Sequence, residues 1–291
     1  MSVNSHSCAL HNIKADTPSI FKELATIKWS EHISEDVVMM CLHAPKISAT
    51  AKPGQFIMMH LGRPDLLLPR PMSIMEAGDG KVYVAFAVVG KGTKHLEQMG
   101  KAASDDYIDV VQNTLWLTGP LGTGFTINRA HKKIAVVGGG LGIPPLVMLS
   151  RILRGGKYVR STPVSDYVFG DVHVDAYLGY RDEPLDYFTD EPSNRFIATD
   201  TGAYGFKGNV IDLLNSKNET YDMIYACGPK PMLRALSEYA MRINTACEIS
   251  MEERMGCGVG TCVGCVADTT DGKKKICVDG PVFNSKKIIW T

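Results

Sequence analysis

The sequence predicts a multidomain protein: an antiparallel β-barrel, then an α/β domain with a parallel sheet, then a small C-terminal cysteine-rich domain. Short apolar runs separated by proline and glycine turns occupy residues 20–125, which is typical of a barrel. Strand-like and helix-like runs alternate through residues 126–247, which is typical of a parallel sheet. Four closely spaced cysteines lie within residues 248–291. Residues 1–19 are polar and weakly patterned, so we expect an N-terminal extension there.

Composition and charge exclude several classes of function. The 291 residues carry 31 basic and 31 acidic side chains, so the zero net charge gives no electrostatic basis for binding nucleic acid or an anionic membrane. No apolar run approaches the roughly 20 residues that cross a bilayer. The start of the chain lacks the basic and apolar regions of a signal peptide, so we expect a cytoplasmic protein with reduced thiols.

The clearest motif consists of Cys257, Cys262, Cys265 and Cys277. The first three follow the spacing C-x4-C-x2-C and the fourth comes after a gap, as in plant-type ferredoxins that hold a [2Fe–2S] cluster. Interleaved glycines allow backbone N–H groups to face the sulfurs. Structural zinc usually needs two C-x2-C pairs, of which only one is present, and disulfides suit secreted domains. We therefore prefer a [2Fe–2S] cluster, a one-electron carrier, over zinc or disulfides.

Two stretches of the barrel predict a flavin site. Arg70-Pro71-Met72-Ser73 joins a guanidinium, whose fork matches a phosphate, to a serine that can reach the edge of a flavin ring. The later stretch Val88-Val89-Gly90-Lys91-Gly92-Thr93 brings a strand end, two glycines and a helix start together, which suits a pyrophosphate. The first stretch alone also fits an exposed turn with a solvated arginine, but the combination favours flavin. The expected elements are strands at Phe21–Lys28, Val37–His43, Gln55–Leu61 and Lys81–Val89, a helix at Gly92–Met99, and a hinge at Gly119–Phe125.

The next stretch predicts a dinucleotide site. A buried strand at Ile134–Val137 leads into Gly138-Gly139-Gly140-Leu141-Gly142, after which Pro144 and Pro145 open a helix to about Arg154. Such a turn presents helix N–H groups to a phosphate. Its spacing differs from G-x-G-x-x-G, and a tight turn without a ligand would look the same. Further strands are expected at Asp175–Tyr180, Phe196–Thr199, Tyr221–Cys227 and Glu248–Met251, with helices within Gly205–Leu214 and at Pro231–Arg242.

The ligand of a parallel sheet lies at the carboxyl ends of its strands, where the glycine turn would meet Cys227 and Gly228. Cys227 either faces the nicotinamide or is an inert core thiol. Asp182 and Glu183 follow the second strand; they would favour NAD over NADP if they bind a ribose hydroxyl, or they form a solvated acidic loop.

In combination, these motifs resemble the electron-transfer subunits of B-type dihydroorotate dehydrogenases, within the ferredoxin–NADP reductase superfamily. The resemblance runs from about Ile20 to the C-terminus. The chain departs from the family pattern at residues 1–19 and at residues 155–171, which look like an insertion. The matching motifs are Arg70–Ile74, Val89–Thr93, Gly119–Phe125, Gly138–Leu146, Ala226–Met232, Glu253–Cys257 and Cys277–Phe283.

The resemblance implies an FAD-binding barrel, an NAD-binding α/β domain and a C-terminal [2Fe–2S] domain whose cluster is ligated by the four cysteines. It also implies a TIM-barrel partner subunit that binds FMN and oxidises dihydroorotate, usually in a heterotetramer. The implied FAD contacts are Arg70, Pro71, Met72, Ser73, Ala87, Val88, Val89, Gly92 and Thr93, and the expected NAD contacts are Gly138, Gly139, Gly140, Gly142, Cys227 and Gly228.

The number of electrons that each cofactor carries predicts the order in which they act. Dihydroorotate oxidation and NAD reduction each move two electrons, while the cluster carries one, so FAD must lie between the cluster and the nicotinamide. The expected path runs from partner FMN to cluster to FAD to NAD, in pyrimidine biosynthesis, without a catalytic residue from this chain. Two other hypotheses are a reductase subunit of a hydrogenase or transhydrogenase, and a non-catalytic binding subunit with structural zinc.

Overall fold

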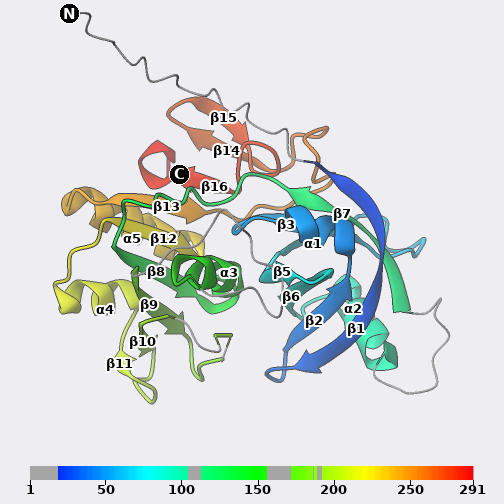
Figure 1. Cartoon of the computed structure of the whole chain (residues 1–291), viewed down its shortest axis with the longest axis horizontal. Coiled ribbons are helices and arrows are strands. Elements are labelled where there is room, and N and C mark those ends of the chain that lie inside the picture. Colours follow the sequence, from blue (N-terminus) through cyan, green and yellow to red (C-terminus); the bar gives the residue numbers. More distant parts are fainter. Residues whose placement is uncertain (1–18, 104–112, 156–171, 186, 189–191, 291) are drawn as a thin grey trace, which may run out of the picture.

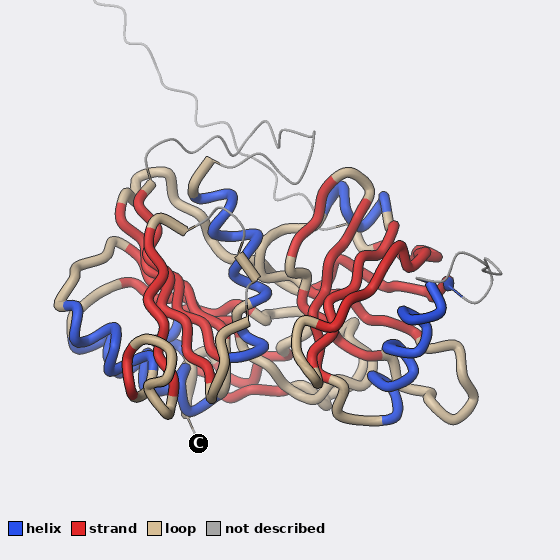
Figure 2. Tube along the Cα trace, turned by 90° about the horizontal axis from the view of Figure 1, so that it is seen from below, coloured by secondary structure: helices blue, strands red, loops and turns tan. Residues whose placement is uncertain are grey.

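The computed structural model describes residues 19–103, 113–155, 172–185, 187–188 and 192–290. Within these ranges the chain forms two seven-stranded sheets and a two-stranded hairpin. Figure 2 shows the two sheets side by side with a helix between them. The predicted N-terminal extension and the predicted insertion lie almost entirely outside the described residues. No helix in the described part of the chain has the length and apolar character needed to span a bilayer.

The first sheet is antiparallel, and its strand order is β4-β3-β7-β1-β2-β6-β5. Successive side chains of a strand point to opposite faces, so every second side chain of β6 is buried. Helix α1 (Pro45–Thr50) and helix α2 (Lys91–Ala103) accompany this sheet. The strands are β1 (Phe21–His32), β2 (Val37–His43), β3 (Phe56–His60), β4 (Arg70–Ser73), β5 (Glu76–Gly78), β6 (Lys81–Ala87) and β7 (Thr114–Leu121).

The antiparallel sheet is a half-barrel, so the predicted antiparallel β-barrel is confirmed in part. Its edge strands β4 and β5 do not pair with each other. The chain itself crosses from one edge to the other between them: the Ile74 N–H donates to Gln55 O at 3.0 Å, and the Met75 N–H donates to Tyr83 O at 2.9 Å. The two edges are therefore joined by two residues of backbone and not by a ladder of hydrogen bonds.

The second sheet has the order β11-β10-β9-β8-β12-β13-β16, and its first six strands run parallel. The connections leave β8 toward β9 on one side and return to β12 on the other, so the topological switch lies at the ends of β8 and β12. The strands are β8 (Lys133–Gly139), β9 (His173–Tyr180), β10 (Asn194–Thr199), β11 (Phe206–Lys207), β12 (Met223–Cys227), β13 (Ala246–Ser250) and β16 (Val282–Asn284), and the helices are α3 (Pro144–Leu153), α4 (Val210–Lys217) and α5 (Lys230–Arg242).

The cysteine-rich segment is built onto the second sheet. The expected boundary between residues 247 and 248 falls inside β13, and β16 from the end of the chain pairs antiparallel with β13. Between these two strands lie the cysteine loop and a hairpin of β14 (Val266–Thr269) and β15 (Gly272–Lys275). An open strand edge attracts a partner strand. The C-terminal segment supplies that partner, so it is an extension of the sheet (Figure 1).

Candidate functional site

The four cysteines lie together as two adjacent pairs. The Cys262 N–H donates to Cys257 Sγ at 3.3 Å, and the side chains of Cys257 and Cys262 interact with each other. Cys277 interacts in the same way with Cys265. Among the described residues, no group of three or more His, Cys, Asp or Glu side chains converges on a single metal position. Two pairs of thiols suit a cluster of two irons, each held by two thiolates.

The loop around Cys257 stabilises a thiolate. Backbone N–H groups of Cys262, Val259 and Thr261 face its sulfur, and they lower the pKa of the Cys257 thiol to about 6. Positive φ angles at Gly258 (72°) and Gly260 (81°) give the loop this shape. Metal ligation requires deprotonated thiols, so these donors fit the predicted cluster.

Cys277 differs, because burial and its neighbour Cys265 raise the pKa of its thiol. A Gly260 N–H nevertheless faces it and acts in the opposite direction. A metal ion that replaces the proton would neutralise the buried thiolate and so remove the cost of deprotonating it. Lys275 stabilises the cysteine loop, because its Nζ donates to Gly260 O at 2.5 Å.

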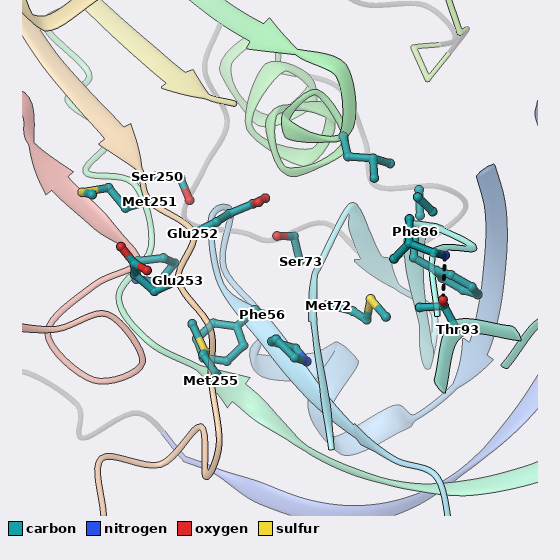
Figure 3. A pocket seen from close by; sticks show the side chains of 16 residues that line it. Phe56, Met72, Ser73, Phe86, Thr93, Ser250, Met251, Glu252, Glu253 and Met255 are labelled. Atoms are coloured by element: carbon teal, nitrogen blue, oxygen red, sulfur yellow. Dashed lines mark hydrogen bonds between the residues drawn. The ribbon is translucent and has the colours of Figure 1, made fainter. Parts of the chain in front are cut away.

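A cavity of about 320 Å³ lies between the two sheets, next to the cysteine loop. Figure 3 shows Met72 and Ser73 on one side of it and Glu252 on the other. Of the predicted flavin contacts, Pro71, Met72, Ser73, Ala87, Val89 and Thr93 line the cavity.

The residues predicted to bind the flavin phosphate, Arg70 and Gly92, lie next to each other. The guanidinium of Arg70 occupies the space where Gly92 would carry a side chain, so Arg70 lies against the first turn of α2. Its Nη1 donates to Leu68 O at 2.6 Å. A guanidinium beside a helix N-terminus attracts phosphate in two ways, by charge and by the helix dipole. Gly92 is needed there because any Cβ would displace the guanidinium.

The turn before α2 is held by Thr93. Its hydroxyl accepts from the N–H of Val89 at 3.0 Å and of Gly90 at 3.2 Å (Figure 3 shows the first of these). Val88 does not line the cavity; its N–H donates to Asp36 O at 2.7 Å and its side chain packs against the core. Of this stretch, Val89 and Thr93 therefore face the predicted flavin, while Val88 anchors the turn.

The glycine turn after β8 meets the end of β12 as predicted. A Cβ on Gly142 would collide with the backbone of Cys227 and Gly228, and a Cβ on Gly139 would collide with Met232 of α5. Gly138 is equally enclosed, by Ile143, whereas Gly140 faces open space at a φ of 54°. These glycines let two strand ends approach each other closely, and they leave Leu141 lining the cavity.

The structure modifies the predicted basis of phosphate binding at this turn. Pro144 and Pro145 have no N–H, the Leu146 N–H donates to Ile143 O at 2.9 Å, and all of α3 is buried. The helix start therefore offers few donors.

Cys227 is a core thiol and does not line the cavity. It is fully buried, and burial strongly raises the pKa of its thiol. The neighbouring Ser250, its register partner on β13, lines the cavity in its place. The structure therefore places the Cys227 thiol in the core, and its predicted contact with the nicotinamide stays a prediction.

The sequence did not reveal one whole wall of the cavity. The run Ser250–Met255 follows β13, and Figure 3 shows the Glu252 carboxylate directed into the space opposite Ser73. Although Glu252 is open to the cavity, the surrounding protein raises the pKa of its carboxyl. An acidic residue after a strand carries no local signature, so only the fold could identify it. The lining residues that sequence reasoning missed are Phe56, Ala85, Phe86, Leu141, Ser250, Met251, Glu252, Glu253, Met255 and Pro281.

Comparison with known families places these features in context. Residues 252–289 match the iron–sulfur cluster binding domain of dihydroorotate dehydrogenase B. A solved structure described as an NADH-dependent reduced ferredoxin–NADP oxidoreductase that performs flavin-based electron bifurcation is similar over 91% of this chain and 89% of its own, with a TM-score of 0.74 and 25% identity. A ferredoxin reductase of carbazole 1,9a-dioxygenase shares the fold at a TM-score of 0.59 and 22% identity, over 78% of this chain and 67% of its own.

Curated relatives extend the match to almost the whole chain. The electron transfer subunit of dihydroorotate dehydrogenase B (NAD(+)) from Clostridium perfringens is 35% identical over 250 residues, covering 84% of this chain and 89% of its own. The subunit of the same name from Geobacillus kaustophilus is 33% identical over 283 residues, covering 93% and 99%. The chain therefore belongs to the family of electron transfer subunits of NAD-dependent dihydroorotate dehydrogenase B.

Proposed function

We propose that this chain passes electrons from the FMN of a dihydroorotate dehydrogenase catalytic subunit, through a [2Fe–2S] cluster and FAD, to NAD. One observation carries the proposal. The cavity that holds the predicted flavin residues is also lined by Met255 and Pro281, which lie two residues before Cys257 and four residues after Cys277. The flavin cavity and the thiol loop therefore share a wall.

The residues of the chain fit each cofactor. The two thiol pairs and the N–H groups around Cys257 would hold the cluster. Arg70 and the start of α2 would bind the FAD pyrophosphate, while Met72 and Ser73 would face its ring system. When bound, FAD supplies the conversion between single electrons and hydride.

The nicotinamide nucleotide would lie at the glycine turn. Leu141 lines the same cavity as Ser73, so a nicotinamide at the strand ends of β8 and β12 would reach the flavin from the side of the parallel sheet. Glu252 is one of two acidic residues that line this cavity, with Glu253. The surrounding protein raises the pKa of its carboxyl, which suits a group that exchanges a proton beside a flavin.

The partner would dock over the thiol loop. Val259, Val263 and Val278 are 44%, 74% and 50% exposed around the cysteines; we call these three residues the loop patch. Exposed apolar residues in a cluster mark protein interfaces, and an electron donor must approach the cluster closely. The partner's FMN and a heterotetrameric assembly are parts of this proposal.

Two substitutions test the docking face. Val263→Asp should weaken co-purification with the catalytic subunit by about tenfold or more, because a charge would be buried at the interface. Met241→Asp alters an exposed apolar side chain on α5, outside the loop patch, and should leave the complex intact. Equal effects of the two substitutions would contradict docking at the loop patch.

The electron path itself is tested by removing one ligand. Cys262→Ala should abolish the iron and acid-labile sulfide of the purified chain and its dihydroorotate-to-NAD activity with the catalytic subunit. Reduction of a dye by NADH should persist, because that reaction needs only the flavin. Cys247→Ala, at a buried thiol outside the loop, is the matched control. Retention of the coupled activity without the cluster would contradict the order of cofactors.

A second candidate function is supported by the similarity to the bifurcating oxidoreductase. In that case the chain would serve as the flavin and iron–sulfur subunit of a transhydrogenase. Reconstitution separates the two. Formation of NADH from dihydroorotate with a dihydroorotate dehydrogenase catalytic subunit supports the first function, and its absence, with iron and flavin fully loaded, supports the second.

A further inference from the structure

A buried ion pair joins the two halves of the molecule. Glu76 on β5 and Arg151 on α3 are 4% and 8% exposed, and Arg151 Nη1 donates to Glu76 Oε1. One residue before Glu76, Met75 O accepts from the Met148 N–H of the same helix at 3.2 Å. Helix α3, the green helix of Figure 1 beside β5, is thus fixed to the edge of the antiparallel sheet by two polar contacts.

The residues next to each member of the pair along the chain are mostly apolar. Ile74, Ala77, Leu146 and Leu149 are buried in the same hydrophobic cluster, which runs from the antiparallel sheet into α3. Apolar packing is not directional, so it would allow α3 to slide or rotate against β5. A buried ion pair persists only with accurate geometry, because desolvation of both charges must be offset. The pair therefore fixes one position of α3 on β5.

The pair lies between the two predicted nucleotide sites. Glu76 is three residues beyond Ser73, the last flavin residue of β4, and α3 begins two residues beyond Gly142 of the glycine turn. Ser73 and Leu141 line the same cavity, while neither member of the pair does. A shift of α3 against β5 would change the separation of these two walls.

We propose that Glu76 and Arg151 are a positioning pair that sets the nicotinamide turn against the edge of the flavin. The inference rests on the proposed function and deepens it. Hydride transfer requires the reacting atoms about 3–3.5 Å apart, and a displacement of about 1 Å costs on the order of a hundredfold in rate. The pair thus acts on hydride transfer through geometry, without touching either cofactor.

The test compares the pair with an apolar replacement in the flavin-loaded full chain. Glu76→Gln leaves the Arg151 charge without its carboxylate, and the double variant Glu76→Leu/Arg151→Met replaces both charges with apolar side chains of similar size. We expect the double variant to melt close to the wild-type temperature, since such replacements are often neutral or stabilising. Its flavin should nevertheless be reduced by saturating NADH about tenfold or more slowly in stopped-flow experiments, with little change in half-saturating NADH.

A second readout does not need activity. Hydrogen exchange at the Met148 amide should be faster in both variants, because the contact of α3 with Met75 loosens. Leu214→Ala, a cavity-forming change on α4, controls for general loss of stability. It should lower the melting temperature and leave the rate of flavin reduction unchanged.

The outcomes are distinguishable. A wild-type rate in the apolar double variant, or the same rate loss in Leu214→Ala, overturns the positioning role. If NADH does not bleach the flavin of the wild-type chain, the proposed function fails instead. The pair is then judged by Met148 exchange alone, which must be faster in the apolar double variant than in Leu214→Ala.

Discussion

The two turns that face the central cavity, each proposed to bind a phosphate, are built differently. The turn before α2 brings the Arg70 guanidinium against a helix start, with Gly92 leaving the space for it. The turn before α3 opens on Pro144 and Pro145, and every residue of that helix is buried. Charge and helix dipole act together at the first turn, and few helix donors remain at the second. This difference suits a resident cofactor on one side and an exchanging nucleotide on the other.

The largest effect on FAD binding is expected when the positive charge of Arg70 is removed. Arg70→Ala should weaken FAD binding by about 10- to 100-fold, because a charge-assisted hydrogen bond is worth roughly 1.5–3 kcal/mol. Flavin content of the purified chain and titration of the flavin-free chain with FAD measure this. Arg63→Ala removes an exposed arginine whose partner Asp65 is only two residues away, and it should change nothing. Full flavin content in Arg70→Ala would contradict the proposed role of the guanidinium in FAD binding at the turn before α2.

The second prediction concerns the glycine turn before α3. Gly142→Ala would push a Cβ into the backbone of Cys227 and Gly228, so the strand ends must separate. We expect about a tenfold rise in half-saturating NADH with flavin content unchanged. Gly140→Ala faces open space and is strained only by its φ of 54°, so its effect should be smaller. Loss of flavin in Gly142→Ala would show that the two turns are not independent.

A smaller change tests whether Gly92 is needed to place the Arg70 guanidinium. Gly92→Ala would displace the Arg70 guanidinium without removing its charge, so FAD binding should weaken by a few-fold, less than in Arg70→Ala. Gly90→Ala, two residues earlier, meets no atom within 4 Å and serves as the control. Identical FAD dissociation constants for Gly92→Ala and Gly90→Ala would argue against guanidinium placement as the function of this glycine.

The smallest effect concerns Glu252, on the wall opposite the flavin residues. The carboxyl is exposed to the cavity, and the protein around it raises its pKa in the folded chain, so the unfolded chain binds fewer protons at this group between the two pKa values; solvent screening keeps the effect small. Stability is therefore lost as pH rises above the ordinary value of about 4.5. Glu252→Gln should raise the melting temperature of the cofactor-free chain by about 1–2 °C at neutral pH. The gain should disappear near pH 4, and a gain that persists there would contradict a protonation effect.

Much of this molecule could be predicted from local patterns. Apolar runs bounded by turn residues located β2 and β6 to within two residues, and the glycine and proline pattern located the turns before α2 and α3. The spacing of the cysteines was enough to expect a cluster, and the matched domain agrees with it. These features depend on residues near one another in the chain, where periodicity and turn chemistry act directly.

Other features depend on which distant segments meet. Strand ladders and helix packing alone decide that β16 completes the parallel sheet, that Cys227 is enclosed beneath the glycine turn, and that the run Ser250–Met255 forms a wall of the cavity. The pairing of Glu76 with Arg151 spans 75 positions in the sequence. A single sequence carries no local signal for such contacts, because the same carboxylate or guanidinium would fit equally well in solvent. The sequence by itself therefore determined which cofactor chemistry the chain can support. The tertiary structure decided that residues of the two predicted nucleotide sites and the segments flanking the thiol loop meet at one cavity.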